Sequence, residues 1–271
     1  GDVYKRQKSH FLKILSYLLS NQEVCGKRAI DYFADKFDDP MMYAQAVKSV
    51  SVPTQSILFN IDIEGPLTKD KTAVLRVFAK MFYNHCGFYG DDLKIAKLER
   101  FIEKQGKTQQ FREAFEKVNG APWTETRDSF AFFEDDIVSV LQSTLGMSEQ
   151  AARNWFNGEE TNELSIAQLV ADIQEYVDGK GKDFRLLFMV DEVGQYIGDD
   201  GDLMINLQSL VEEIGIRCHG KVWVMVTSQE AIDSVVHITG NDFSKIQGRF
   251  NTRLSLSSSS VDEVIKKLSL I

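Results

Sequence analysis

Short runs of apolar and β-branched residues predict three buried strands. Within RLLFMVDEVGQ, residues Leu186 to Val190 are continuously apolar, which is typical of a strand buried on both faces, as in a parallel sheet. Ser56–Ile63 (SILFNIDI) and Lys221–Val226 (KVWVMV) have a similar character. We expect these three segments to lie side by side in one parallel sheet.

Most of the remaining chain has apolar residues at helical spacing. Lys8–Leu19 places its leucines on one face, and no strand is expected between Asp91 and Gly179. Further helices are predicted at Lys27–Phe37, Met41–Val50, Lys71–His85, Leu93–Glu103, Gln109–Val118, Phe133–Leu145, Ser148–Phe156, Ser165–Val177, Leu203–Cys218, Glu230–His237 and Val261–Leu270, with a short strand at Thr252–Leu256. Alternation of strands and helices favours a doubly wound α/β sheet with right-handed crossovers.

Composition excludes several classes of function. The 271 residues carry a formal net charge of −9, with a pI of about 5.1, which argues against broad polyanion binding. The three cysteines are far apart and odd in number, so they predict neither a disulfide framework nor a metal site. The chain has no apolar run of membrane-spanning length and no signal-peptide pattern, so we expect a cytoplasmic protein that does not enter a membrane.

Two acids follow the central strand directly. Asp191 and Glu192 would lie at the carboxyl end of a parallel strand, where open α/β sheets bind ligands. This pattern is that of a Walker B motif, in which Asp191 would hold Mg²⁺ and Glu192 would polarise the attacking water. The alternative interpretation is a buried strand that ends in a solvated acidic turn.

A lysine and a serine open the first helix. Lys8 and Ser9 stand where the pattern GxxxxGK[ST] places its phosphate-binding lysine and its Mg²⁺-binding hydroxyl. The two glycine positions of that pattern hold Asp2 and Gln7. The loop as written is therefore not a phosphate loop, and the alternative is a charged helix start with a chance Lys-Ser pair.

Polar and basic residues later in the chain complete the candidate site. Thr227 and Ser228 follow the third strand, where a hydroxyl can sense phosphate or orient water; otherwise they cap the strand. Arg249 can supply the positive charge that a transferred phosphoryl group needs, with Arg253 four residues on, because guanidinium binds phosphate oxygens bidentately. Taken alone, Arg249 fits a surface or strand-start residue better.

Several segments together resemble the P-loop ATPase family of the BREX phage-defence systems (BrxC/PglY type), from Lys8 to the C-terminus. They are KSHFLKILSYLL, SILFNIDI, RLLFMVDEVGQYIGDDGDLMINLQSLVEEIG, GKVWVMVTSQEAID and DFSKIQGRFNTRLSLSS, in the family's order. The resemblance implies a three-layer P-loop NTPase fold of the AAA+/ASCE type, with ATP and Mg²⁺ as cofactors. Its first central strand, beside the strand that ends at Thr227-Ser228, is missing.

The resemblance also implies roles for individual residues. Lys8 and Ser9 resemble the end of Walker A, with Ser9 and Asp191 on the metal. Thr227 or Ser228 resembles sensor 1, and Arg249 an arginine finger acting on a neighbouring subunit of a homo-oligomer, with Arg253 beside it.

The implied organisation is a P-loop NTPase core at 8–65 and 182–256, a helical insertion at 66–181 and the start of a lid domain at 257–271. Asp2–Gln7 (DVYKRQ) looks like a translated sequencing adapter that replaces the glycine loop, and we expect both ends to be truncations.

The expected function is the ATP-hydrolysing core of an antiphage defence ATPase, although the chain itself is expected to be inactive. It would remodel other defence-system proteins within an assembly that has DNA as a possible partner. The first alternative is a non-catalytic nucleotide-sensing or scaffold module in that assembly, and the second is a helical interaction domain whose acidic strand end is incidental.

Overall fold

The computed structural model describes residues 2–66, 68–158 and 163–228, with side chains from residue 8 onward. The chain divides into two compact units. Unit 1 comprises Gly1–Val77 and Ile166–Ile271, and unit 2 comprises Phe78–Ser165. The predicted limits of the helical insertion, 66–181, enclose unit 2, and each unit is described below by itself.

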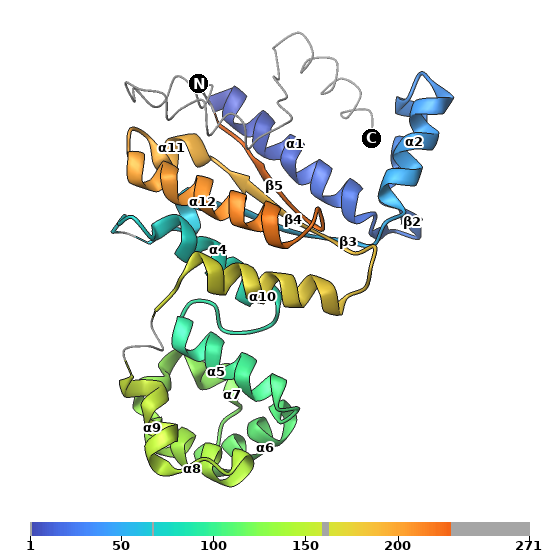
Figure 1. The fold of residues 1–271 in the computed structure, drawn as a ribbon. Coiled ribbons are helices and arrows are strands. Elements are labelled where there is room, and N and C mark those ends of the chain that lie inside the picture. The colour runs from blue at the N-terminus through green and yellow to red at the C-terminus, as the bar shows by residue number, and fades with distance from the viewer. Residues whose placement is uncertain (1, 67, 159–162, 229–271) are drawn as a thin grey trace. The chain divides into compact units, whose positions relative to one another are not determined.

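Unit 1 contains the predicted parallel sheet, which confirms the α/β class. Its strands are β3 (Thr54–Asn60), β4 (Arg185–Asp191) and β5 (Val222–Val226), in the order β3-β4-β5 (Figure 1). All pairs are parallel, and the register sets Asn60 opposite Asp191 and Val190 opposite Val226. The carboxyl ends of the three strands therefore lie along one edge of the sheet. Among the described residues β5 pairs only with β4, and its Trp223 is 46% exposed.

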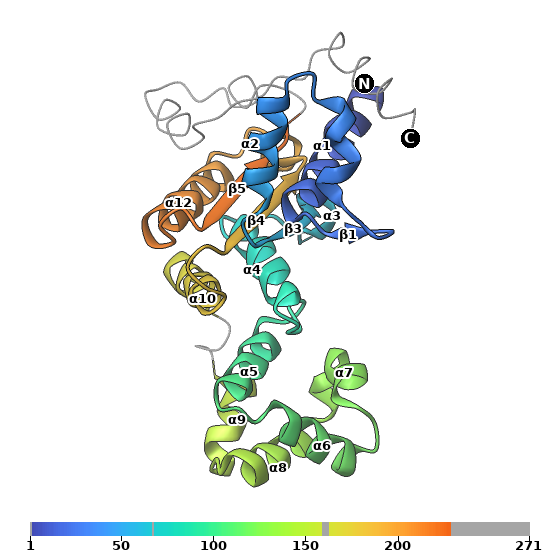
Figure 2. The same ribbon diagram turned by 90° about the vertical axis from the view of Figure 1, so that its right-hand side faces the viewer.

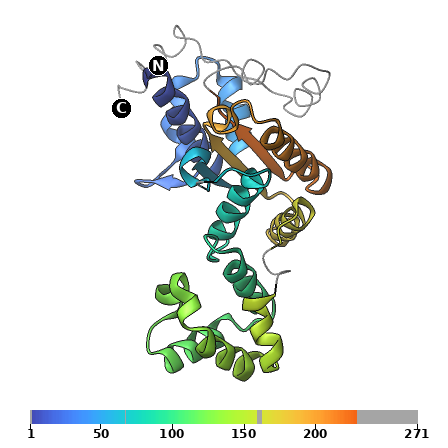
Figure 3. The same cartoon turned by 90° about the vertical axis from the view of Figure 1, so that its left-hand side faces the viewer.

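Helices cover both faces of the sheet, as Figures 1, 2 and 3 show from three sides. Successive strand residues point to opposite faces. Ser56 bonds to Ser16 of α1 (Asp2–Ser20), whereas its neighbour Gln55 accepts a hydrogen bond from Tyr176 of α10 (Ile166–Gly179). Helix α1 therefore packs on one face, and α10 lies on the other together with α12 (Gly201–Arg217).

Helix α1 is held on the sheet by its apolar stripe. Buried Leu12 packs with Leu187 and Met189 of β4, and the partly buried Leu15 and Leu19 join them. The three leucines are spaced three and four residues apart, which places them on one face of a helix. The predicted helix at Lys8–Leu19 is confirmed, but the observed helix already begins at Asp2.

One predicted strand has different limits, and two short helices were not predicted. The first predicted strand ran to Ile63, but β3 ends at Asn60 because the Asn60 side chain accepts the backbone N–H groups of Asp62 and Ile63. That cap starts a short helix, α3 (Ile61–Glu64). A second short helix, α11 (Val193–Ile197), follows β4.

The predicted helix at Lys27–Phe37 is confirmed only in part, as the 3₁₀ helix η1 (Ala29–Lys36). Its first two residues instead form β2 (Lys27–Arg28), which pairs with β1 (Glu23–Val24) in a small antiparallel hairpin. Cys25 and Gly26 have φ of 50° and 79°. Two successive left-handed residues are what a two-residue hairpin turn requires, and glycine adopts this conformation without strain. The chain then continues into α2 (Pro40–Val50), as predicted.

Unit 2 is helical throughout its described residues, as expected. Its elements are most of α4 (Ala73–His85), then α5 (Leu93–Lys104), α6 (Thr108–Asn119), α7 (Trp123–Thr126), η2 (Arg127–Phe132), α8 (Glu134–Leu145) and α9 (Glu149–Asn157). Trp123 is 2% exposed and meets Phe111 and Phe115 edge-on, with ring centroids 5.2 and 5.0 Å away. Trp123 is therefore a core anchor of this unit.

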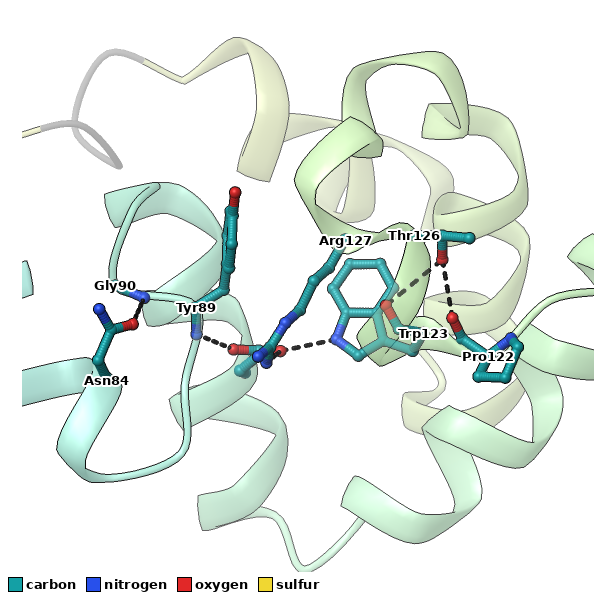
Figure 4. Close-up of polar contacts among 8 residues, drawn as sticks. Asn84, Tyr89, Gly90, Pro122, Trp123, Thr126 and Arg127 are labelled. Atoms are coloured by element: carbon teal, nitrogen blue, oxygen red, sulfur yellow. Dashed lines mark hydrogen bonds and ion pairs between the residues drawn. The ribbon is translucent and has the colours of Figure 1, made fainter.

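A buried carboxylate ties the elements of unit 2 together. Glu99 is 8% exposed and accepts hydrogen bonds from the Tyr89 backbone N–H at 2.5 Å and the Trp123 indole at 2.7 Å. It also accepts one from the Arg127 guanidinium at 2.8 Å. Figure 4 shows the three donors converging on this carboxylate. Because its oxygens are bonded from three sides and its charge is paired, Glu99 is a structural anchor of the unit.

Within the described residues, no helix combines the length and apolar character needed to cross a membrane.

Candidate active site at the carboxyl edge of the sheet

Polar side chains from four elements meet at the carboxyl edge of the sheet. Asn60 and Asp191 are the last residues of β3 and β4, and Thr227 directly follows β5. Helix α1 brings Lys8 and Ser9 to the same edge. The sequence predicted all of these positions except Asn60.

Asp191 is the centre of the group. Its Oδ2 accepts a hydrogen bond from the Ser9 hydroxyl, and its Oδ1 accepts one from the Thr227 hydroxyl. The residue is only 8% exposed. Each oxygen of the carboxylate therefore has its own hydroxyl donor. The two bonds fix the plane of the carboxylate, with Oδ2 toward Ser9 and Oδ1 toward Thr227.

Glu192 adopts an unusual backbone conformation. Its φ of 64° and ψ of 26° lie in the left-handed region, which few non-glycine residues occupy and which costs free energy. Its backbone N–H approaches Asp191 Oδ1 at 3.2 Å and Thr227 Oγ1 at 3.1 Å. Strained residues of this kind concentrate at functional sites, where the surrounding contacts maintain them.

The Glu192 side chain is buried and held by β3. Glu192 is 5% exposed, and its Oε2 accepts a hydrogen bond from Asn60 Nδ2 at 2.8 Å. Asn60 thus bonds Glu192 with its amide nitrogen and caps α3 with its amide oxygen. Asn60 was not predicted as a site residue because the strand was expected to continue to Ile63; a polar residue at a strand end beside Asp191 was the available signal.

Lys8 and Ser228 meet through the backbone. Lys8 Nζ donates to the Ser228 carbonyl at 2.5 Å. The Ser228 hydroxyl is buried and has no hydrogen-bond partner within the described part of the chain. It lies against Gly194, where an added Cβ would collide with it. The structure therefore separates the two hydroxyls after β5, with that of Thr227 on Asp191 and that of Ser228 against α11.

The loop after α3 is fastened to α11. Lys69 Nζ donates to the Tyr196 carbonyl at 3.0 Å, lies 4.0 Å from the centroid of its ring and approaches Asp62 at 3.8 Å. Burial raises the pKa of the Tyr196 phenol above its ordinary value. Asn60 and Lys69, which lie on either side of α3, thus both bind the segment that begins at Glu192.

The oxygen atoms at the edge suit Mg²⁺. The Ser9 hydroxyl and the Asp191 carboxylate are in direct contact, and Mg²⁺ is typically bound by one or two protein oxygens, with water and phosphate oxygens completing its shell. Among the described residues there is no cluster of three or more His, Cys, Asp or Glu that could hold a metal by itself. A magnesium ion here would therefore take most of its ligands from outside the protein.

The phosphate-binding half does not fit as it stands. A phosphate loop presents successive backbone N–H groups to the ligand before its helix begins. Residues 2–7 are instead the first turns of α1, so their backbone follows the helix. The Lys8 side chain is the remaining phosphate-binding group, and it lies on the Ser228 carbonyl.

A separate hollow of about 520 Å³ lies in unit 2, lined by residues of α6 and α8 and by Lys107. None of its lining residues is buried, so it lacks the enclosed polar groups that mark a reaction site. The candidate site stays at the sheet edge.

The other predicted site residues, Arg249 and Arg253, lie outside the described residues, as do the elements predicted beyond Gln229. The chain matches no protein-family model, and no solved structure matches its fold.

Proposed function

We propose that the sheet edge is the metal-binding and water-activating half of an ATP-hydrolysing site. One observation carries the proposal: Ser9 and Asp191, chosen from the sequence as the two protein ligands of Mg²⁺, are hydrogen-bonded to each other. Two side chains that share a metal ion have to lie within a few ångströms of each other. The strand order β3-β4-β5, which sets Asp191 between the ends of two parallel strands, adds support.

Each residue has a defined task in this proposal. Asp191 and Ser9 supply oxygen ligands, and Mg²⁺ bound there would neutralise charge on the phosphates. Glu192 would orient a water molecule or accept its proton, and Lys8 would bind a phosphate oxygen. In the structure Glu192 is bonded to Asn60 and Lys8 to the Ser228 carbonyl, and these contacts hold both side chains at this edge.

At the level of the cell, we propose an ATPase core of the BREX antiphage type in the cytoplasm. ATP hydrolysis would remodel other defence-system proteins within a DNA-associated assembly. In a homo-oligomer, Arg249 would act as the finger on a neighbouring subunit, and Arg253 would assist it. This part of the proposal is supported only by the sequence resemblance.

A non-catalytic nucleotide-sensing or scaffold module is the second candidate. The helical backbone of residues 2–7, which presents no phosphate cradle, favours the scaffold form of this candidate. The two candidates differ in whether a substitution of Glu192 changes ATP turnover in a variant of the chain that can bind nucleotide.

The test restores the two missing glycines within the chain. The double variant Asp2→Gly, Gln7→Gly recreates the GxxxxGKS pattern, and it is compared with the unchanged chain and with the same variant carrying Glu192→Gln. We expect the unchanged chain to show no ATP turnover. We expect the glycine variant to bind Mg-ATP, with stabilisation of about 2.7 kcal/mol at a hundredfold excess over the dissociation constant.

Glu192→Gln separates the two candidates. If Glu192 is the general base, turnover by the glycine variant falls about 10²- to 10⁴-fold, while the melting-temperature shift with Mg-ATP remains. A shift without any Glu192-dependent turnover would support the sensing module instead. Absence of a shift in the glycine variant at saturating nucleotide, identical to a Lys8→Ala control, would contradict both and favour the helical interaction domain.

A further inference from the structure

The hydroxyl of Thr227 lies between the two acids of the site. It donates its proton to Asp191 Oδ1 and accepts the Glu192 backbone N–H at 3.1 Å. A threonine hydroxyl has one proton to donate, and here Asp191 receives it. The hydroxyl in this position therefore has no proton left for a phosphate oxygen.

The backbone of Thr227 is fixed on both sides. Its N–H donates to the Val190 carbonyl and its carbonyl accepts from the Val193 N–H, both at 3.0 Å. The first bond extends the pairing of β5 with β4 by one residue. The second bond attaches Thr227 to Val193, the first residue of α11. The side chain is thus held at the point where the chain turns from Asp191 into Glu192.

We propose that Thr227 is a positioning residue with two tasks, and that it does not contact the substrate. It occupies Oδ1 of Asp191, so that Oδ2, the oxygen bonded to Ser9, is the one presented to the metal. It also stabilises the left-handed backbone of Glu192 through the Glu192 N–H. The first task rests on the proposed function, whereas the second is a property of the fold alone.

Ser228 provides the contrast. Its hydroxyl is buried against Gly194, and its carbonyl holds Lys8. Neither hydroxyl at the tip of β5 therefore points toward a bound phosphate. Thr227 and Ser228, which follow β5, therefore act on the nucleotide only through the residues that they hold, Asp191, Glu192 and Lys8.

Thr227→Val removes the hydroxyl and keeps the shape of the side chain, whereas Thr227→Ser keeps the hydroxyl. Thr54→Val is the matched control, because Thr54 is a 9% exposed threonine at the opposite end of the sheet whose hydroxyl donates to the Val52 carbonyl. The probe is Mn²⁺ alone, titrated into the full chain and followed by water-proton relaxation, with Asp191→Asn as the reference for loss of the site.

We expect Thr227→Val to weaken Mn²⁺ binding about 10- to 100-fold, as for other groups that orient a metal ligand. Thr227→Ser should restore binding, and Thr54→Val should bind as the parent does. Parental binding by Thr227→Val, together with loss in Asp191→Asn, would overturn the first task. Unchanged binding in Asp191→Asn would instead overturn the metal site of the proposed function and the first task with it.

The second task is tested without any metal. Hydrogen exchange of the Glu192 amide should be several-fold faster in Thr227→Val than in Thr54→Val or Thr227→Ser. Equal exchange in all three variants would overturn the support of Glu192 by Thr227. Melting temperatures of the variants show which of them are folded, and Thr227→Ala, which also lacks the hydroxyl, takes the place of Thr227→Val if that variant fails to fold.

Discussion

The Ser9 hydroxyl donates a hydrogen bond to Oδ2 of Asp191, although 182 positions separate the two residues. The contact joins the start of α1 to the end of β4 and fixes where the helix lies along the sheet. It also brings a hydroxyl and a carboxylate together at the edge where parallel sheets bind ligands. The same bond thus serves the packing of α1 and the chemistry proposed for the site.

A double-mutant cycle measures this bond. Ser9→Ala and Asp191→Asn should each lower the free energy of unfolding by about 1–3 kcal/mol, because the bond is partly buried and involves a charged acceptor. The double variant should lose less than the sum, with a coupling of about 0.5–3 kcal/mol in urea unfolding. As the control, Ser16→Ala removes a different hydroxyl of α1, bonded to Ser56, and should add to Asp191→Asn without coupling. Additive losses for Ser9 and Asp191 would contradict the contact.

Asn60→Asp tests the contact between β3 and Glu192. The substitution keeps the oxygen that caps α3 but replaces the amide donor, 2.8 Å from Glu192 Oε2, with a second carboxylate. We expect a loss of about 1–3 kcal/mol in the free energy of unfolding at pH 8. Stability equal to that of the parent at pH 8 would show that the two side chains do not meet.

The strands could be predicted because each is a short apolar run, but their ends could not. Strand β3 continues in sequence with the β-branched Ile61 and Ile63, and the pattern gave no reason to stop. It stops because the Asn60 side chain bonds two backbone N–H groups ahead of it, a local competition that apolar periodicity does not detect. Asn60 was missed as a site residue for the same reason.

The residues of the candidate site could be predicted from the sequence, but the contacts among them could not. Motif spacing selected Lys8, Ser9 and Asp191, yet the partner of Lys8 is a backbone carbonyl at Ser228, which no sequence pattern marks. Thr227 and Ser228 were interchangeable in sequence. They became distinct because successive residues at the end of a strand point in opposite directions, one toward Asp191 and the other toward Gly194.

Glu99→Gln tests the polar anchor of unit 2. The charged acceptor of three hydrogen bonds becomes a neutral amide that can no longer accept from all three donors. We expect the free energy of unfolding to fall by about 1.5–3 kcal/mol, measured by urea unfolding with tryptophan fluorescence as the signal. Glu103→Gln on the same helix is the control; Glu103 is exposed, so it should change stability by less than about 0.5 kcal/mol. Equal stabilities of the two variants would contradict an anchoring role.

Gly65→Ala tests the close approach of the α3 end to α11. A Cβ at Gly65 would lie 2.6 Å from a ring carbon of Tyr196 and 2.7 Å from the Ile61 carbonyl oxygen. Since a backbone atom is involved, the neighbours cannot relieve the clash by rotation, and we expect a loss of about 1–3 kcal/mol. Gly215→Ala in α12 meets nothing within 4 Å and should stabilise the protein by about 0.5–1 kcal/mol. Thermal unfolding of both variants checks the opposite signs, and stabilisation by Gly65→Ala would exclude the contact with Tyr196.

Cys218 should make stability depend on pH in the alkaline range. Burial raises the pKa of its thiol from 9.0 to about 11, so the folded protein keeps the thiol neutral while the unfolded chain ionises. The contribution of the buried thiol to the free energy of unfolding is complete below pH 9. It is lost as the pH rises toward 11, at up to about 1.4 kcal/mol per pH unit. The difference in unfolding free energy between the parent and Cys218→Ala should therefore shrink from pH 8.5 to pH 10.5. Cys25→Ala is the control, since Cys25 is exposed. The same burial predicts that a thiol reagent at pH 8 labels Cys25 in the native protein and reaches Cys218 only after unfolding; equal labelling rates would contradict the buried position.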